Sequence, residues 1–234
     1  MTFDPSQIKA MTFDVGGSVF DWQTSVKARV SELAMRHSVE LDEHEFAHRW
    51  RRRFFAMIAD IRAGKQAKMN ADDIHRHLLD GVCEQYGLPL SNEEKDDLTW
   101  VWHELEVWPD VPDALERLRT RYKVTILSVL SLSILVDSSK HAGISWDGMM
   151  SCEFLSHYKP EPESYQQGAR LLACDIDETM MVAVHPPDLA AAAAAGMRTG
   201  FVEPKMEEGG SSGDSSGFDV QAKDYGDFAI QMNC

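Results

Sequence analysis

Three polar residues at widely separated positions could carry chemistry. Asp14 directly follows a short apolar segment and precedes two glycines, Asp188 lies in a loop after a second apolar segment, and Lys159 stands directly before a proline. A carboxylate on a glycine-containing loop lets a substrate approach closely and can act as a nucleophile. A lysine ammonium can stabilise such a carboxylate, or a negative charge that develops during a reaction.

Each of these residues also has a structural explanation. Asp14 suits a turn or a helix N-cap, Lys159 suits the surface before a turn, and Asp188 suits the cap of the helix that follows it. Any single segment is explained in this way without invoking function. A catalytic role therefore depends on whether the fold brings the three residues together.

The second half of the chain alternates between expected helices and expected strands. After Pro109 we expect helices over 112–121, 134–142, 162–172 and 189–195, and strands over 124–127, 149–153, 180–184 and 199–202. Together with a first strand over 8–13, this alternation predicts a parallel sheet with helices on both faces. Ligands of such sheets bind at the carboxyl ends of the strands, where Asp14, Ser128 and residues 185–188 are expected.

The region between residues 21 and 106 has a different pattern. Its apolar residues recur at helical spacing, as in Phe46, Trp50, Phe54 and Met57, with no convincing strand. We therefore predict an α/β fold: a Rossmann-like parallel sheet core flanked by helices, with an inserted all-helical cap. The predicted core domain comprises 1–20 and 108–234, and the predicted cap comprises 21–107. The composition of 207–217 predicts a flexible surface loop.

Composition excludes several classes of partner. The formal net charge of −15 argues against nucleic acid and against an anionic membrane surface. The four cysteines show no metal-site spacing and the histidines are scattered, so we expect no metal and no cofactor. The chain shows no apolar run long enough to span a membrane and no signal-peptide pattern, so we expect a cytoplasmic protein.

The order of these features resembles the haloacid dehalogenase superfamily, and within it the type II 2-haloacid dehalogenases. The resemblance covers nearly the whole chain, and the order is strand–aspartate, cap, strand–serine, lysine–proline and strand–loop–aspartate. The most specific stretches are Phe13–Val15, Val19–Trp22, Arg49–Arg51, Asp73–Arg76, Trp102–His103, Trp108–Asp110, Lys140–Gly143, Trp146–Asp147, His157–Pro160 and Met180–Ala183.

This resemblance implies a reaction and a set of catalytic residues. In that family the nucleophile, here Asp14, displaces halide from the α-carbon of a small 2-haloalkanoic acid, and water hydrolyses the resulting ester to release a 2-hydroxy acid. The chemistry is metal-free. Lys159 matches the lysine that steadies the nucleophile. Ser128 matches a serine that binds the substrate or nucleophile region, and Asp188 matches an aspartate that positions the lysine and the hydrolytic water.

The resemblance also implies residues that bind a small anionic substrate. Arg51 matches a cap arginine that meets the substrate carboxylate or the leaving halide, and an arginine suits either anion. Ser18, Val129 and His185 complete the expected substrate-binding set. Because related enzymes are often dimers, the resemblance also implies a homodimer as one possible oligomeric state.

Several positions depart from the family pattern. Gly16 replaces an aromatic residue, Val129 replaces an asparagine, and Pro186 and Pro187 replace an asparagine and an aromatic residue. Because these positions border the inferred pocket, a homologue with altered or lost catalysis is one alternative. A phosphatase of the same superfamily is another. It is disfavoured because Gly16 stands where a general-acid aspartate is usual, and Val184 where a carboxylate ligand of Mg²⁺ is usual.

Overall fold

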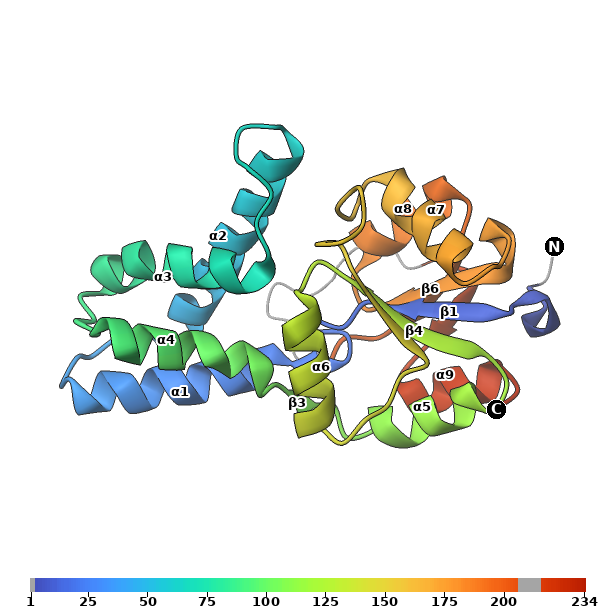
Figure 1. Ribbon diagram of the computed structural model, residues 1–234. Helices are drawn as coiled ribbons and strands as arrows, with labels where there is room; N and C mark the ends of the chain where they lie inside the picture. Colours follow the sequence, from blue (N-terminus) through green and yellow to red (C-terminus); the bar gives the residue numbers. More distant parts are fainter. Residues whose placement is uncertain (1–2, 206–215) are drawn as a thin grey trace. The chain divides into compact units, whose positions relative to one another are not determined.

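The protein is described here by a computed structural model, which covers residues 3–205 and 216–234 (Figure 1). Two compact units make up the chain. The sheet unit comprises Met1–Phe20, Val107–Leu132 and Gly143–Cys234, and the helical unit comprises Asp21–Glu106 and Ser133–Ala142. The helical unit thus includes a segment that lies within the predicted core range of 108–234, and the exact domain limits stay a prediction. Residues 207–215 of the predicted loop lie outside the described residues.

The sheet unit is built on six strands in the order β5-β4-β1-β6-β7-β8. The five strand pairs of this sheet are all parallel, which confirms the predicted α/β fold class. Their bounds are β1 Ala10–Phe13, β4 Lys123–Ser128, β5 Gly148–Ser151, β6 Thr179–Ala183, β7 Arg198–Val202 and β8 Val220–Ala222. In register, Phe13 lies between Ile126 of β4 and Val182 of β6. The carboxyl ends of these three central strands therefore lie side by side.

Helices cover both faces of this sheet (Figure 1). Helices α5 (Val111–Arg119) and α9 (Tyr225–Gln231) pack together on one face, and α7 (Pro162–Leu171) and α8 (Pro186–Ala195) pack together on the other. Short 3₁₀ turns η1 (Pro5–Gln7) and η3 (Ile176–Glu178) precede β1 and β6. Every residue of the central strands β1 and β6 is buried, as expected for a sheet covered on both faces.

Two glycines of the sheet unit differ in the space around them. A Cβ added at Gly200 of β7 would lie 2.6 Å from Cε2 of Phe228, whose ring is fully buried. A Cβ added at Gly168 of α7 would lie 3.5 Å from Cδ2 of Leu127, an ordinary van der Waals distance. Gly200, unlike Gly168, is therefore needed for close packing of a helix against the sheet.

The helical unit contains α1 (Trp22–Arg36), α2 (Glu43–Arg62), α3 (Ala71–Tyr86), α4 (Asn92–Trp100), η2 (Val101–His103) and α6 (Leu132–His141). Helices α1 to α4 begin at side-chain caps: Asp21, Asp42, Asn70 and Ser91 each accept a hydrogen bond from a backbone N–H of the following first turn. Two short strands, β2 (Phe20–Asp21) and β3 (Glu106–Val107), form a separate two-stranded sheet.

A buried histidine joins three elements of the helical unit. The two ring nitrogens of His103 lie 2.6 Å from Asp72 of α3 and 2.8 Å from Asp137 of α6. Burial alone would lower the pKa of His103, but its hydrogen bonds and charge interactions with the two aspartates raise it above the ordinary value. The hydrogen bonds of His103 therefore link η2 to α3 and α6.

Candidate active site

Asp14 lies at the carboxyl end of the central strand of the sheet. Its backbone N–H donates to the carbonyl of Val182 at 3.0 Å, which extends the ladder between β1 and β6 by one residue. The chain then turns sharply, with Gly17 at a φ of 95°. The Asp14 side chain is almost buried, at 11% exposure. Asp14 thus occupies the position in which ligands of parallel sheets are bound.

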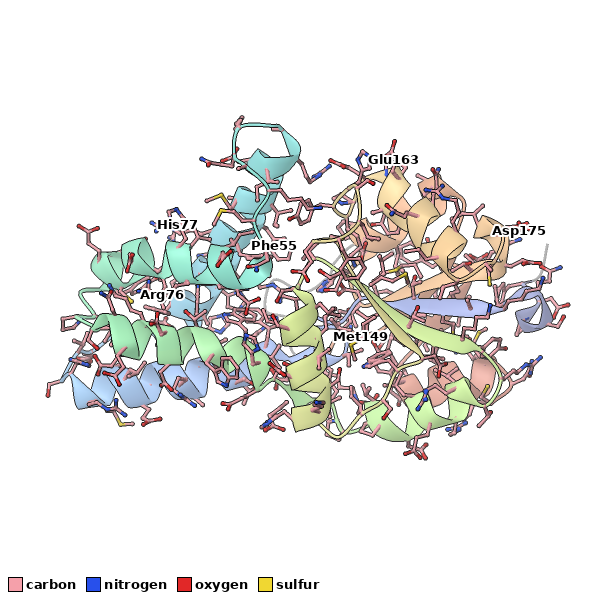
Figure 2. The ribbon with its side chains drawn as sticks, in the orientation of Figure 1. Phe55, Arg76, His77, Met149, Glu163 and Asp175 are labelled. Atoms are coloured by element: carbon pink, nitrogen blue, oxygen red, sulfur yellow. The ribbon has the colours of Figure 1, made fainter. Side chains whose placement is uncertain are left out.

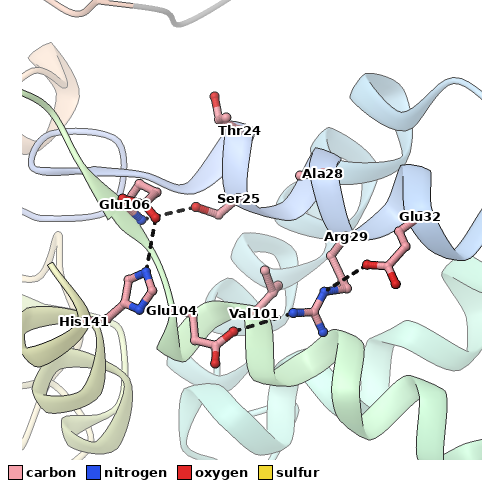
Figure 3. Close-up of a pocket in the computed structure, with 9 residues that line it drawn as sticks. All are labelled: Thr24, Ser25, Ala28, Arg29, Glu32, Val101, Glu104, Glu106 and His141. Atoms are coloured by element: carbon pink, nitrogen blue, oxygen red, sulfur yellow. Dashed lines mark hydrogen bonds and ion pairs between the residues drawn. The ribbon is translucent and has the colours of Figure 1, made fainter.

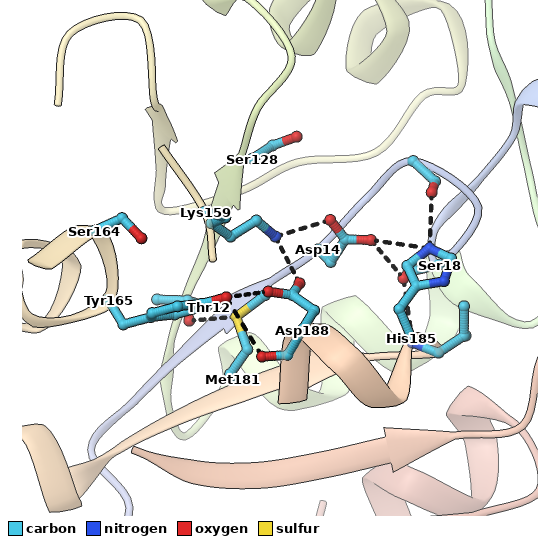
Figure 4. Close-up of polar contacts among 12 residues, drawn as sticks. Thr12, Asp14, Ser18, Ser128, Lys159, Ser164, Tyr165, Met181, His185 and Asp188 are labelled. Carbon is cyan, nitrogen blue, oxygen red and sulfur yellow. Dashed lines mark hydrogen bonds and ion pairs between the residues drawn. The ribbon is translucent and has the colours of Figure 1, made fainter. Parts of the chain in front are cut away.

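Lys159 connects Asp14 to Asp188 (Figure 4). Its Nζ lies 2.9 Å from Oδ1 of Asp14 and 2.7 Å from Oδ2 of Asp188. The lysine is buried and comes from the loop before α7, and its peptide bond to Pro160 is cis. Three segments that are far apart in the sequence therefore meet at one ammonium group, as the sequence-based hypothesis requires.

Asp188 does not cap a helix, although helix capping was the non-catalytic explanation for this residue in the sequence. Helix α8 begins at Pro186, with His185 as its N-cap residue, so Asp188 lies within the first turn. Prolines suit the first turn because their missing N–H would have no partner in the helix. A carboxylate in this turn is favoured by the helix dipole. The Asp188 side chain instead accepts hydrogen bonds from Lys159 and from Tyr165.

Tyr165 is a site residue that the sequence did not reveal. It is fully buried on α7, and its hydroxyl donates to Oδ1 of Asp188 and approaches the Asp188 carbonyl oxygen at 3.4 Å. Burial raises the pKa of this phenol far above its ordinary value, and the negative charge of Asp188 raises it further. Tyr165 therefore remains a neutral donor that fixes the orientation of the Asp188 carboxylate.

The second oxygen of Asp14 has its own partners. Ser18 Oγ donates to Oδ2 of Asp14 at 2.8 Å and accepts from the backbone N–H of Val184 at 3.2 Å. Nε2 of His185 lies 3.5 Å from the same carboxylate oxygen and 3.2 Å from the carbonyl oxygen of Gly16. Both oxygens of the Asp14 carboxylate are therefore held in place.

These contacts determine the charge of the site. Burial alone would raise the pKa of Asp14, but the charges of Lys159 and then His185, with hydrogen bonds from Lys159 and Ser18, lower it to about 2. Burial alone would lower the pKa of Lys159, but the two aspartates raise it above its ordinary value. Near neutral pH the site thus contains an ionised carboxylate beside an ammonium. Such a carboxylate suits a nucleophile rather than a general acid.

Ser128 and Val129 lie at the end of the neighbouring strand β4. The Ser128 hydroxyl accepts a hydrogen bond from the backbone N–H of Leu130 at 3.2 Å, and Val129 lies in the loop between them. Figure 4 shows Ser128 beyond Lys159 in the same region of the sheet unit. Contacts of Ser128 and Val129 with a substrate stay predictions.

Arg51 belongs to α2 of the helical unit. Its guanidinium carbon lies 4.4 Å from the ring centroid of Trp22 and 5.3 Å from that of Phe55, which is labelled in Figure 2. These are cation–π distances, so two aromatic rings orient the arginine. Its contact with a substrate anion stays a prediction.

The helical unit also contains a surface pocket (Figure 3). Most of the charged groups that line it are already paired: Arg29 with Glu32 and Glu104, and Glu106 with His141. Among residues 3–205 and 216–234, there is no group of three or more His, Cys, Asp or Glu residues that could hold a metal ion. Within the same residues, no helix is both long enough and apolar enough to cross a membrane.

Comparison with known families identifies the chain. A family model described as haloacid dehalogenase-like hydrolase matches residues 8–196. The chain belongs to this family. The match includes Asp14, Lys159 and Asp188, and it confirms the resemblance and the hydrolase class inferred from the sequence.

The relatives of this haloacid dehalogenase-like hydrolase include named dehalogenases. The chain is 25% identical over 198 residues to (S)-2-haloacid dehalogenase 4A of Burkholderia cepacia, covering 82% of this chain and 81% of the relative. It is 24% identical over 198 residues to (S)-2-haloacid dehalogenase 1 of Pseudomonas sp. strain CBS-3, covering 82% and 83%.

Solved structures show the same similarity over a longer part of the chain. The crystal structure of a defluorinating L-2-haloacid dehalogenase matches with a TM-score of 0.92 and 31% identity, covering 100% of both chains. That of a second L-2-haloacid dehalogenase matches with a TM-score of 0.89 and 29% identity, covering 96% of this chain and 99% of that one.

Proposed function

We propose that the protein hydrolyses small 2-haloalkanoic acids to 2-hydroxy acids through an ester formed on Asp14. The observation that carries this proposal is the buried Lys159, which holds one oxygen of an ionised Asp14 at the carboxyl end of β1. The named relatives act on (S)-2-haloacids, so we propose the same enantiomer as substrate.

In the first step, a carboxylate oxygen of Asp14 attacks the α-carbon of the substrate. A carbon–oxygen bond forms, the carbon–halogen bond breaks, and the halide leaves with the bonding electron pair. The low pKa of Asp14 keeps it ionised near neutral pH, so no proton has to be removed before the attack. Arg51 is our proposed contact for the substrate carboxylate or the departing halide.

In the second step, water attacks the carboxyl carbon of the Asp14 ester. The ester carries no negative charge, so Lys159 is released from its pairing with Asp14 and can stabilise the oxyanion of the tetrahedral intermediate. Asp188 accepts the water proton, and Tyr165 and Lys159 hold it in position. Collapse of the intermediate breaks the bond between the carboxyl carbon and the ester oxygen, and the departing alkoxide takes the proton held by Asp188 to become the 2-hydroxy acid. The Asp14 carboxyl group keeps the second hydrogen of the water and returns to its ionised form by releasing that proton to solvent.

The two alternatives are less well supported. For a phosphatase, Gly16 and Val184 supply no carboxylate. The Gly16 carbonyl lies against His185, and the Val184 N–H donates to Ser18. For a homologue without catalysis, there would be no need to keep Asp14, Lys159 and Asp188 in one buried cluster. A cytoplasmic location, a small anionic substrate and a homodimer are further proposals.

The test is halide release from both enantiomers of 2-chloropropionate, from chloroacetate and from fluoroacetate, in the presence of EDTA. We expect release by the unmodified protein and loss of release in Asp14→Asn. Asp177→Asn, which changes an exposed carboxylate of the same unit, is the matched control and should behave like the unmodified protein. Absence of release from folded protein, or undiminished release in Asp14→Asn, would contradict the proposal.

A further inference from the structure

His185 occupies an N-cap position without using its side chain as a cap. It is the N-cap residue of α8, yet no hydrogen bond runs from its side chain to the backbone of the helix's first turn. The imidazole is directed toward Asp14 instead (Figure 4), and its side chain is 22% exposed. Since the His185 side chain makes no capping hydrogen bond to α8, capping does not explain the orientation of the ring.

The contact with Gly16 determines which ring nitrogen carries hydrogen. Nε2 of His185 lies 3.2 Å from the carbonyl oxygen of Gly16, and a carbonyl oxygen can only accept a hydrogen bond. Nε2 is therefore the protonated nitrogen in the neutral ring, and Nδ1 is the nitrogen that gains a proton in acid. Gly16 has no side chain, so only backbone is presented to the imidazole at this position.

The same nitrogen lies beside the nucleophile. Nε2 is 3.5 Å from Oδ2 of Asp14, which is too long for a strong hydrogen bond but close enough for electrostatic attraction. Ser18 donates to that oxygen at 2.8 Å, and Lys159 donates to the other oxygen at 2.9 Å. His185 thus adds a second positive or partially positive group around a carboxylate that already has a full ammonium partner.

We propose that His185 is a positioning residue for Asp14, which steadies Oδ2 while the ring is neutral and slows nucleophilic attack when the ring is protonated. The ring faces the Asp14 carboxylate, whose other oxygen is paired with Lys159 from the loop before α7, and Lys159 is paired in turn with Asp188 from the first turn of α8. A protonated His185 gives Asp14 a second cation and withdraws electron density from the attacking carboxylate. This role rests on the proposed dehalogenase function of the site.

The activity test uses two substitutions of His185. Gln places an uncharged N–H donor near the position of Nε2, whereas Leu places none.

The readout is single-turnover halide release from 2-chloropropionate across a pH series. For the unmodified protein we expect the rate to fall about tenfold as the pH is lowered from neutral into acid. His185→Gln should lower the rate at neutral pH less than His185→Leu does, and it should lose the fall in acid. His185→Leu should lose about tenfold or more in rate with an unchanged KM. A retained fall in His185→Gln, or a change confined to KM in His185→Leu, would overturn the proposal.

A second measurement does not depend on turnover. Nuclear magnetic resonance of the histidine rings reports the tautomer and titration midpoint of His185, assigned by comparison with His185→Gln. We expect the Nε2–H tautomer, and a lower midpoint in Asp14→Asn because the attracting carboxylate is gone. The Nδ1–H tautomer or an unchanged midpoint would overturn the role of His185. If these expectations are met but no haloacid releases halide, the contact stands, while the proposed reaction and the role of His185 in it both fail.

Discussion

Replacing Lys159 by Met removes the cation that Asp14 and Asp188 share. The ammonium lies 2.9 Å from one carboxylate and 2.7 Å from the other, and the Lys159 side chain is 6% exposed. Methionine keeps most of the volume of the side chain but leaves both carboxylates without this partner. Two losses are expected, one in the free energy of unfolding and one in the rate of the reaction.

The size of the stability loss follows from the pKa of Asp14. It lies at about 2 against an ordinary value of 3.8, a difference that corresponds to about 2 kcal/mol of stability near neutral pH. Asp188 loses its cation as well, and breaking a buried ion pair by removing one partner costs about 3–5 kcal/mol. We therefore expect Lys159→Met to lower the free energy of unfolding by about 2–5 kcal/mol. Halide release should fall by about 10³-fold.

The pH dependence of this loss gives a stricter test. Because the pKa of Asp14 is depressed in the folded protein, the contribution of the ion pair is present above pH 3.8 and disappears as the pH falls toward 2. Urea unfolding of the unmodified protein and of Lys159→Met should therefore differ most near neutral pH and converge in acid. Lys9→Met, which breaks an exposed pair with Glu178, is the control and should leave stability nearly unchanged. Equal stability of Lys159→Met and unmodified protein, or a difference that persists unchanged into acid, would refute the reasoning.

Three further predictions concern residues outside the charged pair. Tyr165→Phe removes a donor from Asp188, so we expect a loss of about 1–3 kcal/mol in the free energy of unfolding and slower halide release, with little change in KM. The raised pKa of His103 stabilises the fold below its unfolded-state pKa, and this contribution is lost as the pH rises through the folded-state pKa. The stability difference between unmodified protein and His103→Asn, measured by urea unfolding, should therefore shrink as the pH rises, and a constant difference would contradict this. Gly200→Ala should cost about 1–3 kcal/mol because of the nearby aromatic ring. Gly168→Ala, its control, should be neutral or stabilising by up to about 1 kcal/mol in the same unfolding assay.

The convergence of the site was predictable because it follows from topology. Apolar segments alternating with helices predict parallel strands, and parallel strands place the residues at their carboxyl ends along one edge. Asp14 follows β1, and Asp188 follows β6, which is the neighbour of β1 in the sheet. Lys159 does not directly follow a predicted strand, so its position in the site was predicted from the family resemblance alone.

Element boundaries were less predictable where the sequence sends mixed signals. The sequence predicts a helix from Leu189, but α8 begins at Pro186, since two prolines mark a loop as readily as a first turn. Strand β8 (Val220–Ala222) and helix α9 (Tyr225–Gln231) were not predicted. Both are short, and short elements depend on tertiary packing more than on their own periodicity.

The roles of Tyr165 and His185 could not be derived from sequence patterns. Tyr165 falls on the buried side of a helix, where a tyrosine normally fills the core, and its acceptor Asp188 is reached only because α7 packs against α8. His185 has the sequence position of a cap, and only the folded loop shows its nitrogen against Gly16 and Asp14. Such contacts depend on side-chain direction, which residue spacing does not specify.

The central claim is that Asp14 becomes covalently esterified and is regenerated by attack of water on its own carboxyl carbon. A single turnover in ¹⁸O-labelled water, with enzyme in excess over 2-chloropropionate, tests this directly by mass spectrometry of the product and of the peptide that contains Asp14. The account predicts ¹⁸O in the Asp14 carboxylate and an unlabelled hydroxyl in the product, whose oxygen comes from Asp14. Label in the product with none in Asp14 would show direct attack of water on the substrate and would contradict the account.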